Sequence, residues 1–340
     1  MGLRQVTVAY APGKIILVGE HAVVYGRPAV AVPVTQVRAQ ATVEDATTGQ
    51  GITIVAPDVD QKLLLGGEGG WPSEDPLART VIATLKYLGL SLEQDLTITV
   101  KSDIPIARGL GSGAAVSTAM VRVLAAHFSL ELSPQEVSQL VYEVERIHHG
   151  TPSGIDNTVI AHERPVYFVQ GQTSQTVAVR RTLRLLIGDT GEPSPTKGVV
   201  GAVRRQWRRS RGRYESIFDE IGEIALRVRR SMEEGDIAEM GRLMDENHQL
   251  LRELDVSSPL LDSLVGAARD EGALGAKLSG AGRGGNVIAL VTAERLAQVE
   301  RALLSAGAER VIGTEVPPGG EGTPAMEISE NLARSDEDAV

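Results

Sequence analysis

A glycine-rich loop between a predicted strand and a predicted helix constrains the fold of this chain more than any other feature. Residues 107–115 read ARGLGSGAA, after the alternating stretch LTITV and before the alanine-rich run AAVSTAMVRVLAAHF. Alternation predicts a β-strand, and the alanine-rich run predicts a helix. Glycines let a backbone approach a ligand closely, and a helix N-terminus favours negative charge. The arrangement therefore predicts a loop whose amides face an anion.

Two common phosphate-binding loops do not fit the sequence. A P-loop requires G-x-x-x-x-G-K-[ST], a string that the chain lacks. A dinucleotide fold requires G-x-G-x-x-G between a strand and a helix, with an acidic residue after a second strand about 20 residues on. The glycines of 280–285 precede a strand, and the loop at 109–114 is followed at that distance by a helix. A phosphate held without a P-loop lysine needs positive charge from Mg²⁺ and from a lysine elsewhere, and Ser112 either caps the helix or binds that metal.

Composition excludes several classes of protein. The 340 residues include no cysteine, which rules out disulfides and cysteine-based zinc sites and is typical of a reducing cytoplasm. No apolar run approaches the ~18 residues of a membrane helix, and the first residues lack a basic segment followed by an apolar one, so we expect neither a membrane span nor a signal peptide. The net charge of −10 disfavours nucleic-acid binding. We therefore expect a cytoplasmic protein that binds neither membrane nor nucleic acid.

One basic segment runs against this acidic background. Residues 204–213 read RRQWRRSRGR, with six arginines around Trp207. The favoured interpretation is a solvated helix face with the indole tucked beneath it. The alternative is an anion-binding patch for a phosphorylated ligand or a nucleic acid.

The order of predicted elements divides the chain into two regions that differ in secondary structure. The first 60 residues form short β-rich runs, and helices follow from 76 and after the glycine loop. Ser133 and Glu136 have capping-box spacing, and Glu145 falls at the edge of the apolar stripe of the helix that they begin. Beyond about residue 180, a strand, a polar Gly/Pro linker and helices over 214–234, 236–253 and 257–272 predict an α+β unit.

Three motifs together resemble one family. PGKIILVGEHAVVYG near the start, PIARGLGSGAA in the middle and KLSGAGRGGN near the end are similar to the three ordered motifs of the GHMP small-molecule kinases. Within that superfamily, GEHAVVYGRPAVAVPV and GTPSGIDN at 150–157 most resemble the mevalonate kinase family. The resemblance implies the α+β two-domain GHMP kinase fold, with a ribosomal-protein-S5-like N-terminal ATP-binding domain and a ferredoxin-like C-terminal domain. We place these domains at 1–180 and 181–328, before a disordered tail at 329–340.

The resemblance also implies roles for individual residues. Asp156 matches the catalytic base and Lys14 the lysine beside it, while Ser112 and Glu145 match the Mg²⁺ ligands. Glu20, His21, Thr196 and Gly282 match the substrate side, and the third loop at 279–285 closes over the site. The amides that match the ATP phosphate cradle belong to Ala107, Arg108, Gly109, Leu110, Gly111, Ser112 and Gly113.

The implied activity is phosphorylation of the primary hydroxyl of (R)-mevalonate by ATP and Mg²⁺, a step of isoprenoid biosynthesis, in a chain that forms a homodimer. The sequence departs from the family pattern at Gly113, where a serine is usual, and at Arg283, which interrupts a glycine run before Asn286. An arginine there either contacts a phosphate or points to solvent. The alternatives are therefore another kinase of this fold, such as phosphomevalonate kinase, or a non-catalytic nucleotide and metabolite sensor.

Overall fold

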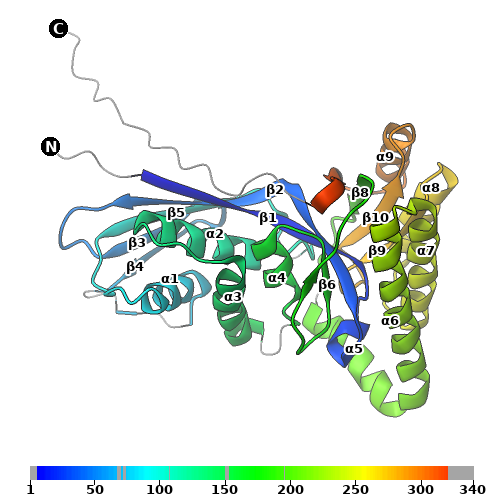
Figure 1. Cartoon of the computed structure of the whole chain (residues 1–340), viewed down its shortest axis with the longest axis horizontal. Helices are drawn as coiled ribbons and strands as arrows, with labels where there is room; N and C mark the ends of the chain where they lie inside the picture. The colour runs from blue at the N-terminus through cyan, green and yellow to red at the C-terminus, as the bar shows by residue number, and fades with distance from the viewer. Residues whose placement is uncertain are drawn as a thin grey trace, which may run out of the picture.

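Two β-sheets and the helices packed on them make up the protein (Figure 1). The computed structural model describes residues 6–66, 70–71, 74–106, 108–149, 153–194 and 196–320, without the side chains of 147–149. Within these residues one sheet has seven strands and the other has four. None of the helices in this part of the chain combines the length and apolar character needed to span a bilayer.

The larger sheet is built on two long paired strands, β1 (Val6–Val18) and β2 (Ala29–Asp45). The strand order is β4-β3-β5-β2-β6-β7, with β1 paired to β2. The other strands are β3 (Ile52–Ala56), β4 (Gln61–Leu65), β5 (Leu96–Ser102), β6 (Val166–Phe168) and β7 (Gln175–Thr176). Along β2 the even-numbered residues from Gln40 to Glu44 are more exposed than the buried Ala39, Ala41 and Val43, as expected for a sheet covered on one side.

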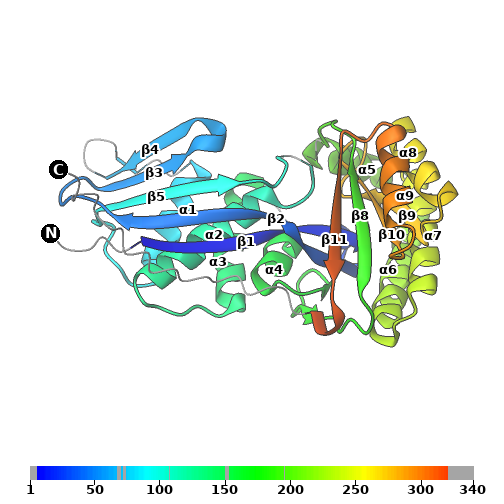
Figure 2. The ribbon, with the colours of Figure 1, turned by 90° about the horizontal axis from the view of Figure 1, so that it is seen from above.

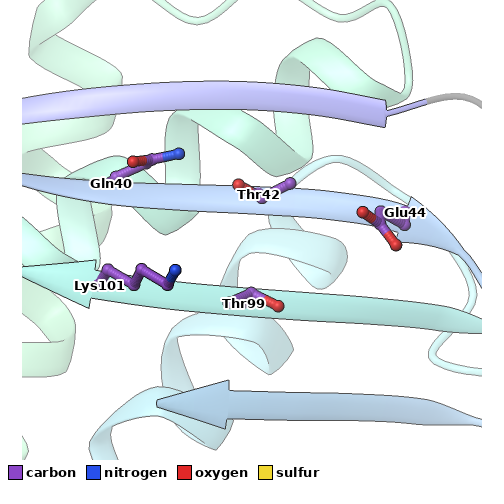
Figure 3. Close-up of a pocket in the computed structure, with 5 residues that line it drawn as sticks. All are labelled: Gln40, Thr42, Glu44, Thr99 and Lys101. Carbon is purple, nitrogen blue, oxygen red and sulfur yellow. The ribbon is translucent and has the colours of Figure 1, made fainter. Parts of the chain in front are cut away.

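Four helices cover the apolar face of this sheet: α1 (Pro76–Tyr87), α2 (Ser112–His127), α3 (Pro134–His149) and α4 (Ile155–His162) (Figure 1). The predicted capping box begins α3, since the Ser133 amide donates to Glu136 Oε2 at 2.8 Å and the Glu136 amide donates to Ser133 Oγ at 3.3 Å. The opposite face is polar, with a shallow groove lined by Gln40, Thr42, Glu44, Thr99 and Lys101 (Figure 3).

The smaller sheet has the strand order β11-β8-β10-β9, and every neighbouring pair is antiparallel. Its strands are β8 (Leu183–Asp189), β9 (Gly275–Ser279), β10 (Asn286–Val291) and β11 (Arg310–Val316). Its helices are α5 (Thr196–Arg209), α6 (Arg211–Glu234), α7 (Ile237–Glu253), α8 (Pro259–Asp270) and α9 (Leu296–Ser305). The order is that of a ferredoxin-like β-α-β-β-α-β unit, as predicted, with four helices, α5 to α8, in the connection from β8 to β9. Three short 3₁₀ turns, Ala22–Tyr25, Pro57–Val59 and Pro318–Gly320, complete the described elements.

Both faces of the smaller sheet are buried. Leu185 and Ile187 of β8 join the core of the larger sheet, whereas Leu186 between them packs with the helices. Ile288 and Val287 of β10 divide in the same way. Figure 2 shows β8 and β11 between the long strands and the helices of the second half. One continuous apolar core therefore passes across the domain boundary predicted at 180.

Two expectations about secondary structure need correction. The runs predicted as separate strands at each end of β1 form one strand, with a register irregularity at Pro12/Gly13 that keeps the chain paired to β2. The segment directly after β8 was expected to be a linker but contains the start of the helix α5, whose end lies in the basic segment for which a helix face was the favoured interpretation. Two glycines within the first six residues of α5 favour a loop, although Val199, Val203 and Trp207 recur at helical spacing.

Candidate active site

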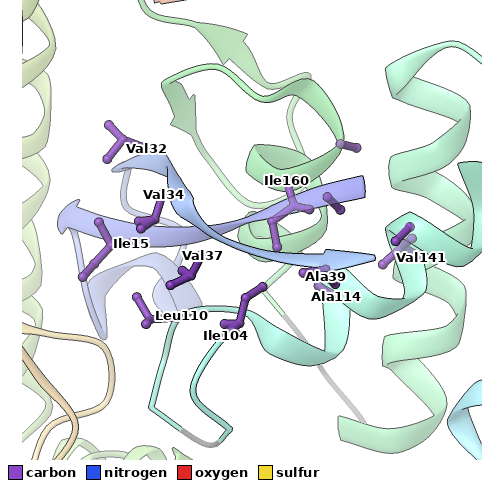
Figure 4. Close-up of a cluster of buried hydrophobic side chains, with 14 of the residues drawn as sticks. Ile15, Val32, Val34, Val37, Ala39, Ile104, Leu110, Ala114, Val141 and Ile160 are labelled. Carbon is purple, nitrogen blue, oxygen red and sulfur yellow. The ribbon is translucent and has the colours of Figure 1, made fainter. Parts of the chain in front are cut away.

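The glycine loop is anchored from below by its one apolar side chain. Leu110 is buried in the core with Val37 and Ile104 (Figure 4). Its carbonyl accepts a hydrogen bond from the Lys14 amide at 2.9 Å, which ties the loop to β1. Leu110 thus fixes the loop to the sheet, while Gly109 on one side of it is exposed and Gly111 on the other is the N-cap of α2.

Position 111 has no room for a side chain, because the side chain of Lys14 passes next to it. Gly111 has a φ of 75°, and a Cβ there would lie 2.9 Å from Ile160 Cδ1 and 3.0 Å from Lys14 Cγ. The first distance is closer than real Cβ contacts come, and the second is at that limit. The absent side chain therefore leaves the space through which Lys14 runs from β1 to α4.

Lys14 ends at Asp156. The Lys14 Nζ lies 2.8 Å from Asp156 Oδ1, with the lysine side chain 4% exposed and the aspartate 36% exposed. Asp156 stands in the first turn of α4, whose N-cap is Gly154. A carboxylate in the first turn is favoured by the helix dipole. The pair thus places a half-open carboxylate beside a buried ammonium, next to the glycine loop.

The residues predicted to hold Mg²⁺ also come together. Ser112 is the first residue of α2, and within the described chain no side chain caps this helix, so the capping interpretation of Ser112 is not observed. Glu145 Oε1 on α3 comes within 3.4 Å of a Cβ built on Gly113. A hydroxyl and a carboxylate are hard oxygen donors of the kind that Mg²⁺ prefers, and this metal usually takes its remaining ligands from water and phosphate. The described residues contain no cluster of three or more acidic or histidine ligands.

Glu20 and His21, directly after β1, are both buried at the junction with the smaller sheet. Lys277 Nζ on β9 donates to Glu20 Oε1, and His21 Nε2 donates to the Ala281 carbonyl at 2.9 Å. Burial lowers the pKa of His21 to about 4, so its imidazole is neutral at pH 7. His21 also has a φ of 62°, which is uncommon for a residue other than glycine.

The third glycine loop lies against two neighbouring segments. A Cβ at Gly282 would collide with the Val256 carbonyl, and the Gly282 carbonyl accepts a hydrogen bond from Ser194 Oγ at 2.8 Å. Thr196 follows two residues later as the exposed first residue of α5. The loop thus joins the start of α5 to the turn before α8.

Arg283 of the third glycine loop contacts the connection between α7 and α8. Its Nη2 lies 2.9 Å from Asp255 Oδ2 and 3.0 Å from the Asp255 carbonyl oxygen. The Arg283 amide donates to the Val256 carbonyl at 2.8 Å. Arg283 therefore braces the third loop against the α7–α8 connection.

The glycine loop at 108–113 is also tied to the smaller sheet. Arg108 Nε lies 3.6 Å from Asp189 Oδ2 at the end of β8. Asn286 at the start of β10 donates to the Arg108 carbonyl at 2.5 Å. Asn286, which follows the third glycine loop, thus links two of the three motifs.

Two family models match this chain: the GHMP kinases N terminal domain over residues 77–163 and the GHMP kinases C terminal domain over 228–309. A mevalonate kinase of Pyrococcus horikoshii is 35% identical over 322 residues, covering 88% of this chain and 92% of the relative. The chain belongs to the GHMP kinase family. A mevalonate kinase of Thermococcus sibiricus is 34% identical, with 90% and 95% covered. The structure of L. major mevalonate kinase in complex with R-mevalonate superposes on this GHMP kinase with a TM-score of 0.79 and 28% identity, covering 92% and 97%.

In this GHMP kinase the fold gathers most of the predicted site residues. Lys14, Asp156 and the loop at 108–113 lie together, and the third loop contacts His21 and Ser194. Ala107 and residues 150–152 of the GTPSGIDN motif lie outside the described residues. Lys277 was missed, although it begins the quoted string KLSGAGRGGN. It lies in β9 (Gly275–Ser279), which was not predicted as a strand, and a lysine between Ala276 and Leu278 in that short run is the signal that would have found it.

The basic segment of this GHMP kinase spans the end of α5 and the start of α6. Trp207 lies 5.3 Å from Tyr25 between ring centroids, and its Nε1 donates to Glu215 at 2.9 Å. The six arginines of 204–213 are exposed. This agrees with the favoured interpretation of a solvated face over a partly covered indole.

Proposed function

We propose that this protein is a mevalonate kinase, which transfers the γ-phosphoryl group of ATP to the primary hydroxyl of (R)-mevalonate and gives 5-phosphomevalonate and ADP. The observation that carries the proposal is the Lys14–Asp156 pair beneath the glycine loop. The near-full-length likeness to mevalonate kinases of 34–35% identity supports the choice of substrate.

The chemistry needs a base, a phosphate cradle and neutralising charge rather than a covalent intermediate. Asp156 is the proposed base, because its half-exposed carboxylate can accept the proton of the substrate hydroxyl. Lys14 orients that carboxylate and stabilises the negative charge that develops on the attacking oxygen. The loop amides and the N-terminus of α2 hold the phosphates, since backbone N–H groups and the helix dipole both favour an anion.

Ser112 and Glu145 are the proposed ligands of Mg²⁺. When bound, the metal supplies charge neutralisation between the phosphate oxygens. Ser112 contributes a hydroxyl at the first position of α2, and Glu145 reaches the same turn from α3. The chain's own part is to fix these two oxygens at the rim of the phosphate loop.

Phosphomevalonate kinase is the alternative that shares this fold and mechanism. The feature that favoured it was Arg283, as a receptor for a phosphate already on the substrate. Asp255 engages that guanidinium instead, so the geometry favours the unphosphorylated substrate. A sensor without catalysis is disfavoured because Lys14 and Asp156 form a pair suited to proton removal.

A coupled ADP-release assay with ATP and Mg²⁺ tests the proposal, with mevalonate and 5-phosphomevalonate offered separately. We expect turnover with mevalonate, and Asp156→Asn should lower kcat by roughly 10²–10⁴-fold while ATP still binds. Glu163→Gln is the matched control, since it makes the same change at the other end of α4, where Glu163 pairs with Arg122. Turnover with 5-phosphomevalonate alone would move the enzyme one step along the pathway. No ADP release with either substrate would favour another kinase of this fold or the non-catalytic sensor.

The homodimer and the cytoplasmic location stay predictions, as does the domain boundary at 180. Size-exclusion chromatography with light scattering measures the first. The proposed substrate is a small anionic molecule, and no role for the arginines of 204–213 is needed to bind it.

A further inference from the structure

Lys277 is a fully buried lysine between the two halves of the protein. It lies on β9, where all five residues are buried, and its own exposure is 0%. Its Nζ donates to Glu20 Oε1 and to the Leu278 carbonyl at 2.6 Å. Lysine is almost never fully buried unless it is paired. A charge in this position therefore needs an explanation in terms of its partner.

The partner, Glu20, has one engaged oxygen and one unengaged oxygen. Oε1 receives Lys277, whereas Oε2 is buried and has no hydrogen-bond partner among the described residues. His21, next in sequence, repeats the pattern: Nε2 donates to the Ala281 carbonyl, which leaves Nδ1 as a buried acceptor that also lacks a described partner. Unsatisfied buried polar atoms are rare in native proteins. Two adjacent acceptors point to a ligand that donates hydrogen bonds.

Glu20 lies between two lysines, and a second carboxylate pairs with one of them. Lys14 acts on Glu20 from β1, Lys277 acts on it from β9, and Asp156 follows beyond Lys14. Burial raises the pKa of Glu20, and the two lysines oppose that rise. His21 in the same turn is neutral, and so is His248 of α7, which lies near Lys277 and whose pKa burial lowers to about 4. A phosphate or carboxylate would be repelled by an ionised Glu20, whereas a neutral hydroxyl would satisfy it.

We propose that Lys277 is a positioning residue for substrate recognition: it holds Glu20 by Oε1 and leaves Oε2 to accept a hydrogen bond from the hydroxyl of mevalonate that is not phosphorylated. This inference rests on the proposed function. Mevalonate has two hydroxyl donors, and Asp156 takes the primary one. The tertiary hydroxyl at C3 is the remaining donor, and it donates its hydrogen bond to Glu20 Oε2.

The test compares mevalonate with its 3-deoxy analogue, 5-hydroxy-3-methylpentanoate. A site built to bind a hydroxyl rejects an analogue that lacks it by about 10⁴-fold in kcat/KM. We expect the wild-type enzyme to discriminate on this scale. Lys277→Met should reduce the discrimination to about tenfold and raise KM for mevalonate without changing KM for ATP. Lys277→Arg should retain much of the discrimination, because it keeps the charge that holds Glu20.

The pH dependence separates positioning from a purely structural role. In Lys277→Met, burial of Glu20 is opposed only by the backbone amide of Glu20 and by Lys14, so the pKa of Glu20 rises further. Protonation removes an acceptor lone pair, so KM for mevalonate should rise as pH falls, whereas the wild type should show a flatter profile. Arg269→Met is the matched control, because Arg269 pairs with Asp245 and also bonds the carbonyl of Ala276 on β9 without contacting Glu20. It should lower thermal stability but keep the discrimination.

Three outcomes would overturn the inference. Equal use of the 3-deoxy analogue by the wild type would refute it without any variant. Unchanged discrimination in a folded Lys277→Met would refute the positioning role, and Glu20→Gln supplies the same test if Lys277→Met does not fold. Loss of discrimination in Arg269→Met would make the effect one of general stability. Absence of any mevalonate turnover in the wild type would instead be a failure of the proposed function.

Discussion

Replacing Gly111 by alanine tests whether the glycine loop is bare in order to admit Lys14. The added methyl would lie 2.9 Å from Ile160 Cδ1 and 3.0 Å from Lys14 Cγ, at a residue whose φ is 75°. Gly109 supplies a control within the same loop. Its φ is 79°, but a Cβ there would meet nothing within 4 Å. The two substitutions therefore share the backbone strain and differ in the contact.

The magnitudes follow from these two terms. A non-glycine residue in the left-handed region costs roughly 1–2 kcal/mol, which both variants bear. Overpacking a filled site costs about 1–3 kcal/mol more, which only Gly111→Ala bears. Lys14 must also shift, and a displacement of about 1 Å at a reacting centre can lower the rate on the order of 10²-fold. We expect Gly111→Ala to lose both stability and kcat.

Urea unfolding of the two variants measures the free energy of unfolding, and the ADP-release assay measures kcat. Equal destabilisation of Gly109→Ala and Gly111→Ala would refute the packing argument. Normal kcat in a destabilised Gly111→Ala would show that the position of Lys14 does not govern phosphoryl transfer. A larger loss of stability at 111 together with a fall in kcat would confirm both parts.

Two further predictions concern pH and the third loop. Burial lowers the pKa of His21 and of His248 from 6.5 to about 4, so the unfolded chain binds more protons between these values. Stability should therefore fall as pH decreases from about 6.5 to about 4. Urea midpoints that increase as the pH is lowered over this range would contradict the assignment. Arg283→Ala removes a pair with an exposed Asp255 and should cost about 0–1 kcal/mol without changing KM for ATP. A raised KM for ATP would place Arg283 on a phosphate.

The local elements of this fold could be predicted from sequence because their signals are local. The Ser133–Glu136 capping box and the strand–glycine–helix order around 107–115 are both present in the structure. The start of α5 was expected to be a linker because it contains two glycines, although Val199, Val203 and Trp207 recur at helical spacing. Its stability depends on packing with residues far away in the chain, such as Tyr25 against Trp207.

The candidate site was predictable where motifs mark it and not where partners meet in space. Lys14 and Asp156 lie in separate motifs, and their 2.8 Å contact agrees with the pairing that the resemblance implied. Lys277 and Glu20 are 257 positions apart, and nothing in either local sequence points to the other. The same holds for Arg283, whose partner Asp255 belongs to the connection between two helices.

The continuous core has a consequence for how substrates enter. Leu185, Ile187 and Ile288 seal the smaller sheet against the larger one, and each buried side chain of this size contributes about 1.5–3 kcal/mol to keeping it there. A hinge motion that separated the two halves would expose all of these apolar side chains to water at once. We therefore expect ATP and substrate to reach the site past the glycine loops at the sheet ends, without separation of the two halves.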